Sequence, residues 1–81
     1  MGRKVSRSKQ LGDVLRKFRN QRGVSQEQLA ALSSLHRTYI GGVERGERNP
    51  SFQSLTRILD ALKVTWSEFG SALDEFIETH K

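Results

Sequence analysis

The sequence contains no cysteine, a single proline and few aromatic residues. Without cysteine the chain forms no disulfide and offers no thiolate metal ligand, which suits a reducing compartment, so we expect a cytoplasmic protein. No apolar run approaches the ~18 residues that a membrane-spanning helix needs, and no signal peptide is visible. We therefore expect no membrane partner.

The combinations of residues that carry enzyme chemistry are also missing. The two histidines, His36 and His80, have no second histidine, cysteine or carboxylate at the spacing of a metal site. The sequence has no glycine-rich phosphate loop and no paired carboxylates in a plausible cleft. It therefore predicts a protein that is not an enzyme and that uses no metal, no cofactor and no small-molecule ligand.

Basic charge is present in excess and is concentrated at one end. The 81 residues carry 14 Lys and Arg against 9 Asp and Glu, a net charge of +5. Residues 1–24 hold eight of the basic residues and one acidic residue, whereas residues 51–81 hold five acidic and three basic residues. A basic end favours a polyanionic partner such as nucleic acid, although a solubilising surface with a basic tail explains the same composition.

Apolar residues recur at helical spacing over most of the chain, and no strand pattern competes. Residues 1–8 lack this spacing and are interpreted as a flexible basic arm, which leaves residues 9–81 as one compact all-α domain. Five short helices are predicted, over residues 9–22, from a capping box at Ser25, from His36 or Arg37 to Gly46, from a cap at Ser51, and from a capping box at Thr65. The expected core includes Leu29, Ile40, Val43, Leu55 and Leu59.

Only residues 33–35 separate the second and third helices, which is the spacing of a helix-turn-helix. In that arrangement the later helix enters the DNA major groove, and its first turn reaches the base edges. Gln26, at the start of the second helix, can bond a phosphate alongside free backbone N–H groups. Arg37 and Thr38 lie in the first turn of the third helix, and an arginine can donate to guanine O6 and N7 together.

The stretch SQEQLAALSSLHRTYIGGVERGERNPS resembles the core of the Cro/CI-type (Xre-like) helix-turn-helix domains of bacterial and phage repressors. Its most specific parts are S-Q-x-x-L-A, R-T-Y-I-x-x-V-E-R-G and R-N-P-S, and the resemblance extends from about Leu11 to Phe69. The third-helix run is also similar to the controller proteins of restriction-modification systems. The resemblance implies a phage-repressor-like fold and a sequence-specific, double-stranded DNA-binding transcriptional regulator.

Position by position, the resemblance implies DNA contacts from the second helix, the third helix and the loop that follows. These contacts are assigned to Gln26, Arg37, Thr38, Tyr39, Gly42, Arg45, Arg48 and Asn49. Independently of the resemblance, His36 is interpreted as a residue near phosphate at the start of the third helix, because it has no second ligand at the spacing of a metal site. For Tyr39, a DNA-backbone contact and half-buried packing both stay open. The resemblance also implies an ion pair between Arg19 and Glu44 that ties the first helix to the third.

Two positions depart from the family pattern. Ser34 stands where the family usually has glycine, so a left-handed backbone there would be mildly strained. Gly41 and Gly42 interrupt the third helix, where each glycine costs about 1 kcal/mol relative to alanine. They are interpreted either as allowing a closer approach to DNA, with readout moved to Arg37, Thr38 and DNA shape, or as tolerated in a frayed last turn.

The fifth helix carries an apolar stripe, and the stripe of the fourth helix begins at Phe52. Phe76 and Ile77 lie beyond the part of the chain that a DNA-binding core requires. We therefore predict a homodimer that places two third helices ~34 Å apart over a palindromic operator. Its interface residues are predicted to be Trp66, Phe69, Leu73, Phe76 and Ile77.

A different class of function uses the same domain. The alternative is an antitoxin-like module that binds a toxin protein through its fifth helix and regulates its own expression. The salt dependence of binding separates the two classes, because counterion release makes DNA affinity fall steeply as salt rises. The arm residues Arg3, Lys4 and Arg7 are predicted to add nonspecific DNA affinity.

Overall fold

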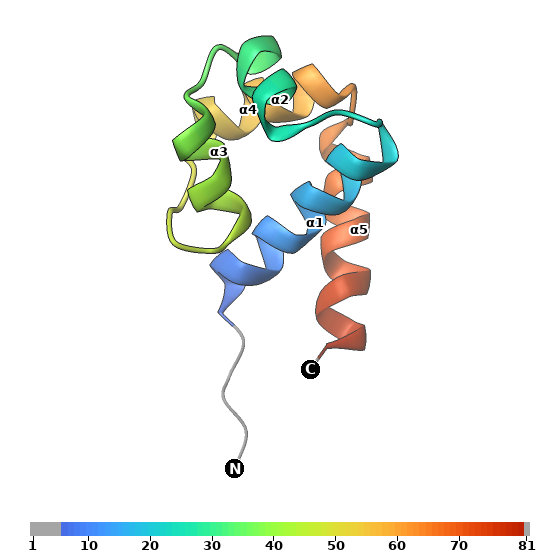
Figure 1. The fold of residues 1–81 in the computed structure, drawn as a ribbon. Helices are drawn as coiled ribbons and strands as arrows, with labels where there is room; N and C mark the ends of the chain where they lie inside the picture. The colour runs from blue at the N-terminus through green and yellow to red at the C-terminus, as the bar shows by residue number, and fades with distance from the viewer. Residues whose placement is uncertain (1–5, 81) are drawn as a thin grey trace.

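The computed structural model describes residues 6–80, and within that range it contains five α-helices and no strands (Figure 1). The all-α prediction is confirmed, and no described helix is both long enough and apolar enough to cross a membrane. Residues 1–5, with Arg3 and Lys4 of the predicted arm, lie outside the described residues. The helices are α1 (Arg7–Gln21), α2 (Gln26–Ser33), α3 (Arg37–Glu44), α4 (Phe52–Leu62) and α5 (Trp66–Thr79).

Helix α1 begins two residues earlier than the sequence predicted. The Ser6 hydroxyl accepts a hydrogen bond from the Lys9 N–H at 3.0 Å and caps the helix. A serine cap is worth about 1 kcal/mol relative to alanine, which is enough to start the helix ahead of its apolar face. Assigning Arg7 and Ser8 to the arm was therefore wrong, because both lie in the first turn of α1.

Three other helices begin at the caps that the sequence predicted. Ser25 and Thr65 open complete capping boxes, in which side chain and backbone bond reciprocally across one turn. The Ser51 hydroxyl caps α4 by accepting a backbone N–H at 3.0 Å. Helix α3 is the exception, because its N-cap residue His36 makes no side-chain capping bond.

The first four helices all end in a Schellman motif, with two backbone hydrogen bonds around one left-handed residue. At the end of α3, the Glu47 N–H donates to the Gly42 carbonyl at 2.9 Å and the Gly46 N–H donates to the Val43 carbonyl at 3.0 Å. Gly46 thus belongs to the turn, and α3 ends before it. The left-handed residues are Gly23, Ser34, Gly46 and Lys63, and the predicted backbone of Ser34 is confirmed by its φ of 59°.

The core lies between the inner faces of all five helices, and the core prediction is confirmed for each residue named from the sequence. Phe52 departs from the prediction, because it is 74% exposed and does not continue the buried stripe of α4. The buried apolar residues are Val14, Leu15, Leu29, Ala30, Ile40, Val43, Leu55, Ile58, Leu59, Leu62, Val64 and Phe69.

Backbone contact fixes the end of α3 against the start of α1. A Cβ atom on Gly12 would lie 2.3 Å from the Val43 carbonyl oxygen, so no other residue fits there. In the same way, a Cβ atom on Gly46 would lie 2.7 Å from the Cα of Lys9. The two glycines let the helices approach closely and hold α3 in one position, and sequence reasoning did not find this role for Gly12.

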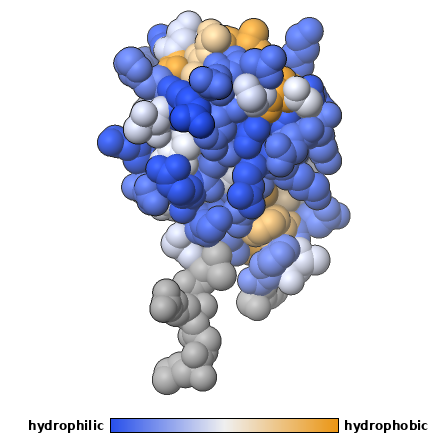
Figure 2. All heavy atoms as spheres, viewed as in Figure 1, coloured by the Kyte–Doolittle hydropathy of each residue, from blue (hydrophilic) through white to orange (hydrophobic). Residues whose placement is uncertain are grey.

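Helices α3 and α5 lie at opposite edges of the view in Figure 1, with α1 between them and with α2 and α4 at the top. Most of the face seen in Figure 2 is hydrophilic. The hydrophobic colour on that face gathers over α2 and α4 at the top and over α5 lower down. Because α3 and α5 are separated in this way, a partner on α3 leaves α5 accessible.

Candidate nucleic-acid interface

Helices α2 and α3 pack against each other and are joined by residues 34–36. The Leu35 N–H donates to the Ala30 carbonyl at 3.0 Å, which closes the turn around the left-handed Ser34. The buried Ser33 hydroxyl donates to the Leu29 carbonyl at 2.7 Å, so its polar group is satisfied within α2. The helix-turn-helix prediction is confirmed.

One face of α3 points away from the core. Residues 37, 38, 41, 42 and 45 follow the spacing that brings side chains to one side of a helix. At the N-terminal end of this face, Arg37 and Thr38 are exposed, and neither side chain makes a hydrogen bond or ion pair with another residue of the range 6–80. Their donor groups are free to meet a ligand.

The N-terminus of α3 adds unpaired backbone donors to this face. His36 is exposed and its side chain forms no capping bond, so no side chain from the N-cap occupies the first N–H groups of the helix. Such groups, together with the helix dipole, favour an anion such as a phosphate. The phosphate contact of His36 stays a prediction.

Gly41 and Gly42 lie on this face of α3 but are buried by neighbouring side chains, and the DNA contact of Gly42 stays a prediction. A Cβ atom on Gly42 would lie 3.2 Å from the Arg48 side chain, and one on Gly41 would lie 3.0 Å from Nη1 of Arg45. The last turn is not frayed, because both glycine carbonyls accept backbone hydrogen bonds, at 3.0 and 2.9 Å. The glycines therefore make room for two arginine side chains across α3.

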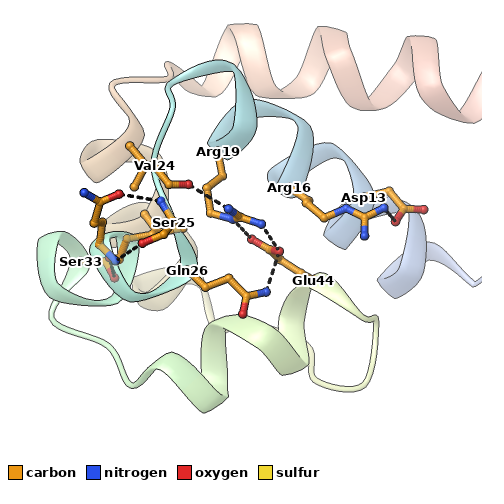
Figure 3. A network of polar contacts seen from close by, with 10 residues as sticks. Asp13, Arg16, Arg19, Val24, Ser25, Gln26, Ser33 and Glu44 are labelled. Carbon is orange, nitrogen blue, oxygen red and sulfur yellow. Dashed lines mark hydrogen bonds and ion pairs between the residues drawn. The ribbon is translucent and has the colours of Figure 1, made fainter.

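A partly buried polar network fixes α1, α2 and α3 relative to one another (Figure 3). Arg19 donates to both carboxylate oxygens of Glu44, from Nε at 2.6 Å and from Nη2 at 3.1 Å, and also to the Val24 carbonyl at 2.8 Å. The amide of Gln26 donates to the same carboxylate at 3.0 Å. The predicted ion pair is confirmed, and a phosphate contact by Gln26 would use its second amide proton.

The loop after α3 brings together the basic and amide residues that the sequence singled out. Arg45 donates twice to Glu47, at 3.0 Å for each bond. These hydrogen bonds lower the pKa of the Glu47 carboxyl and raise the pKa of Arg45. Arg48 is exposed, and the Asn49 side-chain oxygen accepts a hydrogen bond from the Ser8 hydroxyl of α1. The Arg45–Glu47 pair was missed because residues two apart do not meet on a regular helix.

The predicted apolar stripe of α5 is not one exposed surface. Phe69 belongs to the core, and Leu73 and Phe76 are half-buried against it. The expectation that Phe76 lies beyond the core is wrong, because α1 packs beside α5. Tyr39 is also half-buried against the core, in agreement with its packing interpretation. Ile77 is half-buried.

The exposed aromatic surface lies instead at the starts of α4 and α5. Trp66 is 44% exposed and stacks on Phe52, with ring centroids 5.4 Å apart and planes 9° from parallel. Trp66 also meets the buried Phe69 edge to face at 6.2 Å. Of the predicted interface residues, Trp66 is therefore the one most open to a partner.

Comparison with known proteins agrees with this geometry. Residues 15–69 match the helix-turn-helix family. The control protein C.SmaI of Serratia marcescens is 49% identical over 55 residues, which are 68% of this chain and 66% of that relative. The matched region thus spans just under two thirds of the length of C.SmaI.

Solved structures of controller proteins share the whole fold. A mutant of the restriction-modification controller protein C.Esp1396I has a TM-score of 0.91 at 34% identity, covering 98% of this chain and 100% of that chain. The tetramer of C.Esp1396I in complex with its natural 35 base-pair operator gives a TM-score of 0.85 at 36% identity, covering 91% and 97%. Helix-turn-helix regulators are not a class of enzymes. The chain belongs to the helix-turn-helix family of DNA-binding regulators, of the Cro/CI (Xre-like) type.

Proposed function

We propose that this protein is a sequence-specific transcriptional regulator that binds double-stranded DNA with α3 in the major groove. The observation that carries the proposal is the free, exposed pair of Arg37 and Thr38 at the start of the second helix of the motif. Arginine at this place can donate two hydrogen bonds to one guanine, which distinguishes that base from the other three.

Phosphate contacts would fix the orientation of α3 in the groove. Gln26 and His36 stand at the N-termini of α2 and α3, where backbone donors favour anions. Arg45, Arg48 and Asn49 follow α3 in the loop that would run along the DNA backbone. Such contacts position the protein, whereas contacts to base edges select the sequence.

The proposed active species is a homodimer joined through Phe52 and Trp66. Two stacked and exposed aromatic rings gather apolar surface at one place, and aromatic side chains are enriched at protein interfaces. A two-fold dimer would cover the surface with its own copy and match a palindromic operator. Operator occupancy would then depend on protein concentration. The protein would act in the cytoplasm and would have no catalytic role.

Selection from random duplex DNA tests the proposal. We expect the recovered duplexes to share a palindrome whose half-sites are separated by about one helical turn, 10–10.5 base pairs. Recovery of duplexes without a shared sequence would contradict sequence-specific binding.

Sedimentation of two variants tests the dimer. Phe52→Glu places a charge in the proposed interface, and we expect a folded monomer with weaker operator binding, because the native ring is exposed and contributes little to the core. Ile77→Lys, at the far end of α5, is the matched control and should leave the dimer intact. If Ile77→Lys dissociated the dimer and Phe52→Glu did not, the interface would lie at the end of α5 and the proposal would be wrong.

A further inference from the structure

An acidic side chain sits among the arginines of the proposed DNA-binding surface. Glu47 lies in the loop after α3, and its carboxylate accepts two hydrogen bonds from the Arg45 guanidinium, from Nε and from Nη2, both at 3.0 Å. Both side chains are more than half exposed. The pair therefore occupies, in the free protein, the Nε donor and one Nη2 donor of Arg45, which would otherwise be offered to DNA.

The backbone places Glu47 beneath Arg45. The left-handed Gly46, with a φ of 77°, turns the chain, and the Glu47 N–H is held by the Gly42 carbonyl at 2.9 Å. Contact of Gly46 with the backbone of Lys9 in α1 leaves this turn no room to move toward α1. The carboxylate is thus presented by a fixed turn.

The same geometry restrains the arginine. Because Gly41 has no side chain, the Arg45 guanidinium lies back across α3, with Nη1 3.0 Å from where a Cβ would stand. A phosphate that binds Nε and Nη2 together must first separate Arg45 from Glu47, and a phosphate that binds the remaining donors of Arg45 brings its own negative charge close to the Glu47 carboxylate. An exposed pair is weak, so a correctly docked operator with many other contacts can separate it at small cost.

We infer that Glu47 is a specificity-determining residue, which holds Arg45 away from phosphates and so weakens binding to nonspecific DNA more than binding to the operator. The inference rests on the proposed DNA-binding function. In this role an acidic residue weakens binding to all DNA, but it weakens binding to nonspecific sites more than binding to the operator.

The test measures dissociation constants of Glu47→Gln on a selected duplex and on a scrambled duplex, at several salt concentrations. On scrambled DNA we expect Glu47→Gln to bind roughly two- to five-fold more tightly than the charge-matched control Glu75→Gln, because a weak surface ion pair no longer holds Arg45. The salt slope should steepen by about 0.9, the value for one added phosphate contact. The gain on the selected duplex should be smaller, so the specificity ratio falls.

Two controls separate this role from a simple change in charge. Glu75→Gln makes the same substitution at an exposed position on α5, and it should leave the specificity ratio unchanged. In a background of Arg45→Ala, Glu47→Gln should lose its effect, because the residue it releases is gone. Equal effects of Glu47→Gln and Glu75→Gln, or an effect that persists without Arg45, would overturn the inference. An unmodified protein that binds every duplex equally would instead overturn the proposed function.

Discussion

Two arginine–glutamate pairs in this protein share a two-bond geometry but differ in burial. The side chains of Arg19 and Glu44 are 12% and 4% exposed, whereas those of Arg45 and Glu47 are 57% and 61% exposed. Replacing Glu44 with alanine removes the counter-charge of a largely buried guanidinium and leaves an amide proton of Gln26 without its acceptor. The loss should therefore be far larger than the loss of the exposed pair.

The magnitude of the Glu44→Ala effect follows from the burial. Removing one partner of a buried ion pair costs about 3–5 kcal/mol, and we expect about 3 kcal/mol because Arg19 keeps its bond to the Val24 carbonyl. A domain of this length unfolds with a free energy on the order of 4–12 kcal/mol, so the variant would be close to its stability limit. At about 4–8 °C per kcal/mol, its melting temperature should fall by roughly 12 °C or more.

Urea unfolding, followed by the circular dichroism of the helices, measures this loss directly. Glu47→Ala is the matched control, because it breaks the same kind of pair at an exposed position, and its midpoint should stay close to that of the unmodified protein. A Glu44→Ala variant that unfolds at the same urea concentration as Glu47→Ala would refute the reasoning from burial.

Three further variants test other parts of the structure. Lys63→Gly removes the strain of a left-handed backbone at the end of α4, so thermal unfolding should show a free energy of unfolding that is higher by about 0.5–1 kcal/mol. Gly42→Ala adds helix propensity but displaces the Arg48 side chain, so we expect unfolding at equal or higher temperature together with weaker DNA binding, measured by fluorescence anisotropy. Hydrogen bonds from the backbone and side chain of Thr65 lower the pKa of Glu68. The ionised carboxylate therefore stabilises the fold at a pH above the ordinary glutamate pKa, and this contribution to stability is lost as the pH falls through the lowered pKa. Glu68→Gln should therefore be less stable at neutral pH, and the difference should vanish in acid titrations.

The features that the sequence predicted well depend on residues close together in the chain. The capping boxes at Ser25 and Thr65 need only the residue three positions ahead, and both helices begin where that spacing places them. The ion pair between Arg19 and Glu44 is 25 residues apart and was found through family resemblance, because spacing alone does not bring such residues together. Local rules thus predicted where α2 and α5 begin, and the resemblance predicted one long-range contact.

The features that were missed depend on how the helices pack. Phe52 follows the apolar spacing of α4, but its ring stays 74% exposed outside the core and stacks on Trp66, the first residue of α5. In the sequence, Gly12 is an ordinary glycine within a helix, and only the structure shows that the backbone of α3 lies against it. For Gly42, the sequence did not reveal that the turn at Gly46 brings the Arg48 side chain back over it. Each of these depends on a turn or a packed backbone that periodicity does not reveal.

The central claim is that the start of α3 reads base edges, and a comparison of Arg37→Ala with the unmodified protein tests it most directly. Dissociation constants would be measured on the selected duplex and on duplexes that each carry one changed base pair. We expect Arg37→Ala to lose about 1–3 kcal/mol on the selected duplex and to become indifferent to one base pair in each half-site, because a paired contact to guanine is removed. An equal loss on every duplex, with the preference at all positions retained, would contradict the claim and make Arg37 a phosphate contact.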